Sequence, residues 1–478
     1  MDRQEAERLY DSGKDPTVVK LLDYDKENTT LKEKLARLER DSQSSSKPPS
    51  SDNPRDRKEN TRVANNSKRK PGGQPGHPGK NRELLPLDQV TVVACYAAEC
   101  LSCPHFENCR THPMGGEPSS RWQVTEIPPV KPTVTEYQLY SLSGSCGQVH
   151  RGTIPPEVSR SSFGPRLTAM IAYFTAVCHL PRRVVQECFQ IVFGTTLALG
   201  STQNLLNQTS QALAPIDQRL KDALPRQAVI NADESGWYRR WVWIFVTSGF
   251  VYFHIACSRG SDVLKQVLGE IYQGILGVDR WGAYTKYHKG LLQLCWAHLK
   301  RDIRGIKEMG KKLGSKHACG FARRMEYLRN KLMAQWYRYK TGKISRKRLI
   351  LLSKPIQRRM EKCLHDYRDC SDQSVRSFAR RLYKLRSHLC TFISHEGVEP
   401  TNNSSERGIR VAVLWRKICF GNKTDAGAIV SARLLTVTRT CWLQKRNALE
   451  FLVEAITASR GGSPSPVLVM DPKNWTGR

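Results

Sequence analysis

The chain has 478 residues, too many for one compact core, so two to four domains are expected. Its 76 Lys and Arg residues exceed its 44 Asp and Glu residues by 32 charges. Such a surplus favours a nucleic-acid partner over a merely soluble basic protein or one bound to an anionic membrane. No apolar run approaches the roughly 20 residues of a spanning helix, and the first residues lack a signal-peptide apolar stretch. We therefore expect a cytoplasmic protein without a membrane partner.

Residues 1–41 are predicted to form an N-terminal helix or a short coiled coil. Spacings of three and four alternate along one seam of this stretch, which is the heptad pattern. The seam consists of Leu21, Tyr24, Asn28, Leu31, Leu35 and Leu38. Because it is short, a packed surface helix is the alternative.

Residues 42–82 are rich in Ser, Pro, Gly and Asn and offer few apolar groups for burial, so a disordered linker is predicted. Between Lys47 and Arg82 there are ten Lys or Arg residues against three acids. We expect this basic arm, with Lys68, Arg69 and Lys70, to contact DNA phosphates. A solvated tether is the alternative.

Residues 83–155 are predicted to form a small Cys-rich, zinc-finger-like module. The CLSC run at 100–103 has the spacing that lets two thiolates bind one tetrahedral ion. The expected Zn²⁺ ligands are Cys100, Cys103, Cys109 and Cys146. His105 or His112 could replace one thiolate, and without zinc these cysteines would be ordinary small buried residues.

Residues 156–222 are apolar with helical periodicity. Breaks at Leu180-Pro181 and at 194–200 divide them into helices at 165–178, 182–192 and 201–213. Three short helices with a turn before the last resemble a helix-turn-helix that binds DNA. Three-helix packing without DNA is the alternative.

Residues 223–458 change to strand-like apolar runs and then return to helices. The predicted strands lie at 227–237, 240–249, 250–258 and 274–284, with a helix at 261–273. This order predicts an α/β layer with a mixed sheet, in a chain that is otherwise mainly α. From about 300 to 395 a basic helical insertion is expected, with 27 Lys or Arg residues and seven acids between Lys300 and Arg386. Residues 459–478 are expected to be a loose tail.

Three acids are candidates for metal-assisted chemistry. Asp233 closes the strand-like run AVINAD, and Asp279 closes GILGVD. Carboxylates at the ends of neighbouring strands can hold divalent cations, and two cations can activate a nucleophile and stabilise the leaving oxygen of a phosphodiester. Glu406, in PTNNSSERGIR at 400–410, is the candidate third acid. Taken singly, each acid could instead be a turn residue, a helix cap or a first-turn acid.

These motifs resemble the transposases of the IS66 family of bacterial insertion sequences, which are mobile elements with DDE-type transposases. The resemblance covers nearly the whole chain, and its most specific part is the order and spacing of ADESGW, CWAHLKRD and PTNNSSER. Other matching stretches are KPGGQPGHPGK, IPPEVSRSSFGPRLTAMIAYF, VDRWGAY and LWRKICFGNKTDAGA.

The resemblance implies an RNase H-like catalytic core with a helical insertion, in which Asp233, Asp279 and Glu406 bind Mg²⁺ or Mn²⁺. It implies cleavage at the ends of the element and transfer of the freed strand to target DNA. The implied partners are the terminal inverted repeats, further copies of the chain and accessory proteins encoded by the same element. The alternatives are a DNA endonuclease without strand transfer and a non-catalytic DNA-binding repressor derived from a transposase.

Two further motifs bear on metal binding. Gly144 occupies the position of the first cysteine in the family's usual C-x-C-G knuckle, so Cys146 stands there alone. Cys295 and His298, in CWAHLKRD, have a C-x₂-H spacing that recurs after the second aspartate in several DDE families. We interpret them as a buried structural pair, with a role in shaping the core or in binding a metal as the alternatives.

The neighbours of Glu406 are predicted to position it and to bind DNA. Asn402 or Asn403 is expected to cap the helix that carries Glu406. Trp415 and Trp442 are expected in the core. The residues expected to contact DNA phosphates are Arg407, Arg410, Arg416, Lys417 and Lys423.

Overall fold

The protein is represented by a computed structural model that describes most of the chain. The described residues are 3–39, 82–111, 118, 120–145, 147–155, 158 and 161–468. Contacts divide the chain into two compact units. The smaller unit is Asn53–Thr133, and the larger unit combines Met1–Asp52 with Val134–Arg478. Outside the described residues lie the predicted linker up to residue 81, with Lys68, Arg69 and Lys70, as well as Cys146 and the end of the predicted tail. Among the described helices, none is long and apolar enough to cross a bilayer.

The N-terminal stretch forms two helices where one was expected. They are α1 (Arg3–Asp11) and α2 (Lys14–Leu38). Gly13, between them, has a φ of 100°, a left-handed conformation that interrupts a helix and favours glycine. Leu21, Leu31 and Leu35 of the predicted seam are each more than half exposed. Whether this seam pairs with a second copy stays a prediction.

The Cys-rich stretch contains short elements in both units. In the smaller unit, the helices are η2 (Leu87–Gln89), α4 (Ala98–Leu101) and α5 (Phe106–Thr111). In the larger unit, β1 (Ser141–Ser143) and β2 (Val149–Arg151) form an antiparallel hairpin. Cys100, Cys103 and Cys109 carry free, exposed thiols. With Cys146 outside the described residues, the four-thiolate zinc site stays a prediction.

The next three helices are found where they were predicted, but the third continues ten residues beyond its predicted end at residue 213. They are α6 (Pro165–Ala176), α7 (Arg182–Phe193) and α8 (Leu199–Ala223), and the 3₁₀ turn η3 (Leu224–Arg226) follows. Pro181 precedes α7, and Gly194 ends it in a left-handed conformation. Helix α8 packs against α6, α17 (Asp425–Leu443) and α18 (Ala448–Arg460). One face of the third helix, which a helix-turn-helix would insert into DNA, is thus occupied by packing, and DNA binding by this segment stays a prediction.

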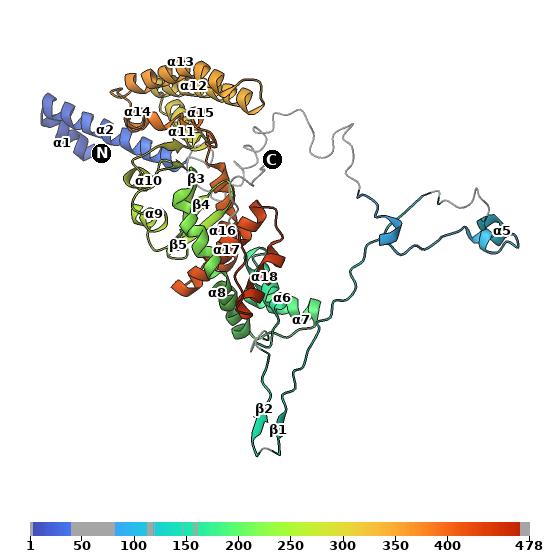
Figure 1. The fold of residues 1–478 in the computed structure, drawn as a ribbon. Coiled ribbons are helices and arrows are strands. Elements are labelled where there is room, and N and C mark those ends of the chain that lie inside the picture. The colour runs from blue at the N-terminus through green and yellow to red at the C-terminus, as the bar shows by residue number, and fades with distance from the viewer. Residues whose placement is uncertain are drawn as a thin grey trace. The chain divides into compact units, whose positions relative to one another are not determined.

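A five-stranded mixed sheet forms the centre of the larger unit (Figure 1). Its strand order is β5-β4-β3-β6-β7, with β3, β4 and β5 antiparallel and β6 and β7 parallel to β3. The strands are β3 (Val229–Trp237), β4 (Arg240–Val246), β5 (Val251–Ala256), β6 (Ile275–Val278) and β7 (Leu292–Leu294). The predicted mixed sheet is confirmed, and β7 is an additional strand that its three-residue length concealed in the sequence.

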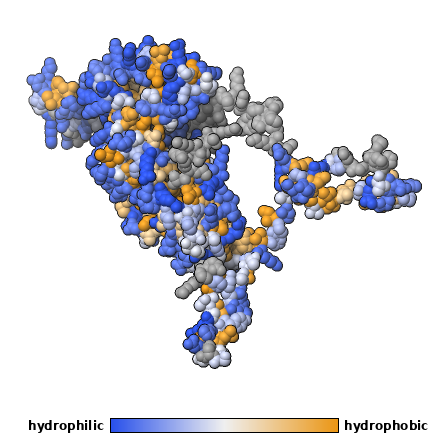
Figure 2. Space-filling view, in the orientation of Figure 1, coloured by the Kyte–Doolittle hydropathy of each residue, from blue (hydrophilic) through white to orange (hydrophobic). Residues whose placement is uncertain are grey.

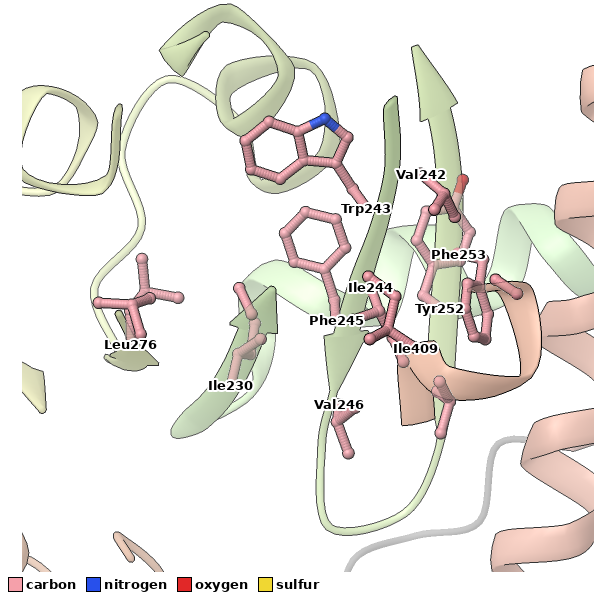
Figure 3. Close-up of a cluster of buried hydrophobic side chains, with 14 of the residues drawn as sticks. Ile230, Val242, Trp243, Ile244, Phe245, Val246, Tyr252, Phe253, Leu276 and Ile409 are labelled. Atoms are coloured by element: carbon pink, nitrogen blue, oxygen red, sulfur yellow. The ribbon is translucent and has the colours of Figure 1, made fainter. Parts of the chain in front are cut away.

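Helices cover the two faces of this sheet. Helix α16 (Asn403–Cys419) packs on β3 and β4, where Ile409 faces Ile244 (Figure 3). Trp243 and Phe245 project from the opposite face of β4 (Figure 3), as strand alternation requires. That face is covered by α10 (Gly282–Tyr287), which packs against α9 (Ser261–Leu268). Trp415 is buried as expected, but the expectation for Trp442 was wrong, because 65% of its surface is exposed.

The chain between β7 and α16 is helical, as predicted. It contains α11 (Trp296–Lys312), α12 (Lys316–Lys340), α13 (Arg346–Asp366), α14 (Gln373–Lys384), η4 (Arg386–His388) and α15 (Thr391–Ser394). Helices α12 and α13 pack side by side (Figure 1). Hydrophilic residues dominate the visible face of this insertion (Figure 2), as its basic composition requires.

Candidate active site

Two aspartates lie at the same level of adjacent parallel strands. Asp233 is inside β3, and Asp279 directly follows β6. The last paired residues of these strands are Asn231 and Gly277. Asp233 and Asp279 each follow two residues later, so the register brings them side by side just beyond the parallel pairing of β3 and β6. The sequence correctly placed Asp279 after its strand, but the prediction that Asp233 ends its strand was wrong, because β3 continues to Trp237 through its pairing with β4.

Strand alternation separates Asp233 from its neighbour Glu234. Asp233 lies opposite Ile244, and a Cβ at Gly408 of α16 would come within 2.5 Å of the Ile244 Cδ1 atom. Asp233 therefore belongs to the face that α16 covers. Glu234 points to the other face, where it accepts a hydrogen bond of 2.5 Å from Tyr284 Oη.

Glu406 lies in the first turn of α16, and its position depends on Asn402. The Asn402 side-chain amide donates a 2.7 Å hydrogen bond to the carbonyl of Ala232, the residue before Asp233. The Asn402 carbonyl accepts from the Glu406 backbone N–H at 3.1 Å. Asn402 is the N-cap residue by position, but its side chain makes no capping bond. The expected cap is thus replaced by a link between α16 and β3.

Asp233 has an electrostatic environment that opposes its negative charge. Burial, followed by the charges of Glu234, Asp279 and Glu406, raises its pKa well above the ordinary value, and the Glu234 backbone N–H opposes this rise. Backbone N–H groups also orient both aspartates: Glu234 N donates to Asp233 Oδ1 at 2.9 Å, and Trp281 N donates to Asp279 Oδ1 at 2.7 Å. Within the described residues, Oδ2 of each aspartate makes no hydrogen bond. Free carboxylate oxygens crowded in this way fit a hard divalent cation.

Arg259 and its aromatic neighbours support the aspartates from the other face. Arg259 donates to Glu234 Oε1 from Nε at 3.0 Å and from Nη2 at 2.8 Å. Its guanidinium carbon lies 4.7 Å from the ring centroid of Trp241 and 4.1 Å from that of Trp281. The Glu234 side chain is 1% exposed and the Arg259 side chain is 35% exposed, so the carboxylate is shielded from water while the guanidinium is partly open to it. The cluster connects the residue after Asp233 with the residue that orients Asp279.

The Glu406 carboxylate faces Cys295 and His298. Its Oε1 atom lies 3.7 Å from Cys295 Sγ and 3.4 Å from His298 Nδ1. One ligand atom from each of these three residues lies within 4.8 Å of the others, and in the described part of the chain Asp233, Asp279 and Glu406 form no such group. Cys295 is buried, as the interpretation of a structural pair requires, but the contact with Glu406 was not foreseen.

A basic cleft adjoins Asp279 and His298. It has a volume of about 460 Å³, and both residues line it. The basic residues that line it are Arg280, Arg301, Arg381 and Lys384. Arg280 is occupied by an ion pair with Asp302. None of these four was predicted as a site residue. The basic composition of the insertion was the only signal in the sequence for cations near the site, and it did not indicate which side chains reach the aspartates.

The predicted DNA-contact residues on and after α16 differ in their surroundings. Arg407, Arg410, Lys417 and Lys423 are exposed. Arg416 is partly buried, and its Nη1 donates a hydrogen bond to the carbonyl of Gly236 at the end of β3. Arg416 therefore binds the sheet with one of its nitrogens, which leaves less of its side chain for DNA.

Comparison with known families identifies two matches. The family model described as Transposase IS66 family matches residues 160–429, more than half of the chain, and this range includes Asp233, Asp279 and Glu406. A family of unknown function (DUF6444) matches residues 14–83. A search of curated proteins finds no match.

Proposed function

The chain belongs to the Transposase IS66 family, and from this premise we propose a metal-dependent DNA transposase of the DDE type. Its catalytic carboxylates are Asp233, Asp279 and Glu406. The reaction is cleavage at the ends of the element, followed by attack of the freed 3′-hydroxyl on target DNA. The observation that supports this proposal is the register of β3 and β6, which sets Asp233 beside Asp279, together with the Asn402 bond that ties the start of the Glu406 helix to Ala232. The charges of Asp279 and Glu406 both raise the pKa of Asp233.

We propose an RNase H-like core for this enzyme, as the resemblance implies. The mixed sheet supports it, because two parallel strands follow an antiparallel meander and the register of β3 and β6 sets the two aspartates side by side. The helical insertion between β7 and α16 supports it as well, since Glu406 is reached only after this insertion.

Asp233, Asp279 and Glu406 would hold Mg²⁺ or Mn²⁺, because their donor atoms are carboxylate oxygens. When bound, such cations activate the attacking oxygen and stabilise the leaving oxygen of the phosphodiester. The chain's own part is to hold these carboxylates in place. The Glu234 and Trp281 N–H groups fix Oδ1 of each aspartate and leave Oδ2 for the cation.

The basic cleft would bind the DNA backbone beside the scissile phosphate. Arg301, Arg381 and Lys384 line it next to Asp279 and carry positive charge for phosphate oxygens. The exposed Arg407 and Arg410 would continue this surface along α16. The family further suggests terminal inverted repeats, additional copies of the chain and accessory proteins as partners.

The test is cleavage and strand transfer by the purified full chain with Mg²⁺ or Mn²⁺, on DNA that carries the repeats flanking its gene. Asp233→Asn, Asp279→Asn and Glu406→Gln should each abolish both steps. Asp222→Asn and Glu454→Gln, at exposed positions on α8 and α18, are matched controls that should keep both. Wild-type cleavage by any of the three variants would overturn the assignment.

The same assay separates the two alternative functions. Nicking without joining by the wild-type chain would indicate an endonuclease. Binding of the repeats with no cleavage under either metal would indicate a repressor derived from a transposase.

A further inference from the structure

We propose that Cys295, His298 and Glu406 form a binding site for a thiophilic divalent cation of the zinc type, separate from the magnesium site but sharing Glu406 with it. The three side chains come from two different helix starts. Cys295 immediately precedes α11 and His298 lies in its first turn, whereas Glu406 lies in the first turn of α16.

The distances within the cluster fit tetrahedral coordination. Zinc bonds of about 2.3 Å to sulfur and about 2.1 Å to nitrogen or oxygen, at tetrahedral angles, place N and O about 3.4 Å apart and S and O about 3.6 Å apart. The observed separations from Glu406 Oε1 are 3.4 Å to His298 Nδ1 and 3.7 Å to Cys295 Sγ. Both separations from Glu406 Oε1 therefore match zinc coordination, and one ligand atom of each residue lies within 4.8 Å of the other two.

The donor atoms are available for a metal. His298 Nδ1 is buried and makes no hydrogen bond within the described structure, so a metal ion would satisfy it. The Cys295 side chain is buried, and its thiol would release its proton on binding a metal. The Asn402 backbone N–H donates to Cys295 Sγ at 3.2 Å, and the start of α11 favours negative charge there.

The donor set distinguishes this site from the magnesium site. A thiol and an imidazole suit zinc, whereas Mg²⁺ prefers carboxylate oxygens and water. Three protein ligands leave the fourth tetrahedral position open to water or to a substrate oxygen. The backbone also holds the site close to Asp279, since Cys295 N donates to the carbonyl of Val278 at 2.8 Å.

Sharing of Glu406 has a consequence that rests on the proposed function. A zinc ion on Glu406 would neutralise this carboxylate and repel a second cation nearby. Zinc should therefore inhibit Mg²⁺-dependent cleavage, with Cys295 and His298 determining its affinity.

Metal binding is tested first, without DNA. The full chain carrying Cys100→Ser and Cys103→Ser, which removes two of the predicted zinc ligands in the Cys-rich stretch, is loaded with Zn²⁺ or Co²⁺ and freed of excess metal. Adding Cys295→Ser to this chain should remove one equivalent of bound metal and weaken the thiolate–cobalt absorption. Adding His298→Ala instead should have the same two effects. Cys363→Ser, at a buried cysteine of α13, is the matched control and should change neither. Circular dichroism of the metal-free proteins shows whether each variant is folded.

Equal metal content in the parent chain with Cys100→Ser and Cys103→Ser and in its folded Cys295→Ser and His298→Ala variants would overturn the proposal and leave only the Cys295–Glu406 hydrogen bond. The second measurement is the Zn²⁺ concentration that halves Mg²⁺-dependent cleavage, which should rise at least tenfold in Cys295→Ser. Loss of one equivalent in a chain that cleaves no DNA would support the zinc site while the transposase proposal fails. DNA cleavage by a chain whose zinc content is unchanged by Cys295→Ser and His298→Ala would support the transposase proposal while the zinc site fails.

Discussion

Replacement of Asn402 by alanine tests whether one side chain aligns the two halves of the proposed active site. Asn402 is 1% exposed, and its amide donates a 2.7 Å hydrogen bond to the Ala232 carbonyl. This bond connects the residue before Asp233 with the start of the helix that carries Glu406. Alanine removes the donor but leaves the helical backbone intact.

The expected cost follows from the burial of this bond. Removal of one partner of a buried hydrogen bond costs about 1–3 kcal/mol. Asn402 Oδ1 is itself buried and has no hydrogen-bond partner among the described residues, so its loss offsets part of that cost. We therefore expect about 1–2 kcal/mol less stability against unfolding. Catalysis should suffer more, because a displacement of about 1 Å at a catalytic group can cost about 100-fold in rate.

The assay pairs urea unfolding with Mg²⁺-dependent cleavage of a labelled duplex that carries the element's end. Asn403→Ala is the matched control, because Asn403 is the adjacent asparagine and its side chain makes no hydrogen bond within the described residues. It should change the cleavage rate less than twofold. Equal effects of the two substitutions, or full activity of Asn402→Ala, would refute this role for the Asn402–Ala232 bond.

Three further predictions concern DNA, pH and zinc. Joint replacement of Arg381 and Lys384 by alanine should weaken binding to DNA that carries the element's end and to unrelated DNA alike. Measured by fluorescence anisotropy, the slope of log binding constant against log salt concentration should fall in magnitude by about 2. An unchanged slope would place the DNA elsewhere. Burial, which outweighs the nearby Arg433, raises the pKa of Asp217 to about 6 from 3.8, so the folded state binds more protons than the unfolded state between these values. Stability in urea should therefore fall from about pH 4 to about pH 6, and Asp217→Asn should remove up to about 3 kcal/mol of this fall; an identical pH profile would contradict it. Cys100→Ser in the full chain should lower its zinc content by one equivalent, and unchanged content would remove the zinc prediction for the Cys-rich stretch.

Much of the core follows from local patterns in the sequence. Apolar runs of strand length bounded by Gly, Ser and Asp correctly predicted β3 to β6, because such runs bury their side chains only within a sheet. The last predicted helix before β6 is shorter than expected, since Gly269 ends α9 with a φ of 82°. The short strand β7 lacked a pattern of its own.

The sequence by itself determined the sheet-forming segments, the basic insertion and the position of Asp279 after its strand, because these depend on neighbouring residues. Only the tertiary structure decided which groups meet Glu406. Its carboxylate faces Cys295, 111 positions earlier, because Asn402 ties α16 to β3 and Gly408 lets the helix lie close to Ile244. Two adjacent asparagines look alike in the sequence, yet only one reaches the sheet. Contacts between segments so far apart depend on helix position and side-chain direction, which local periodicity does not specify.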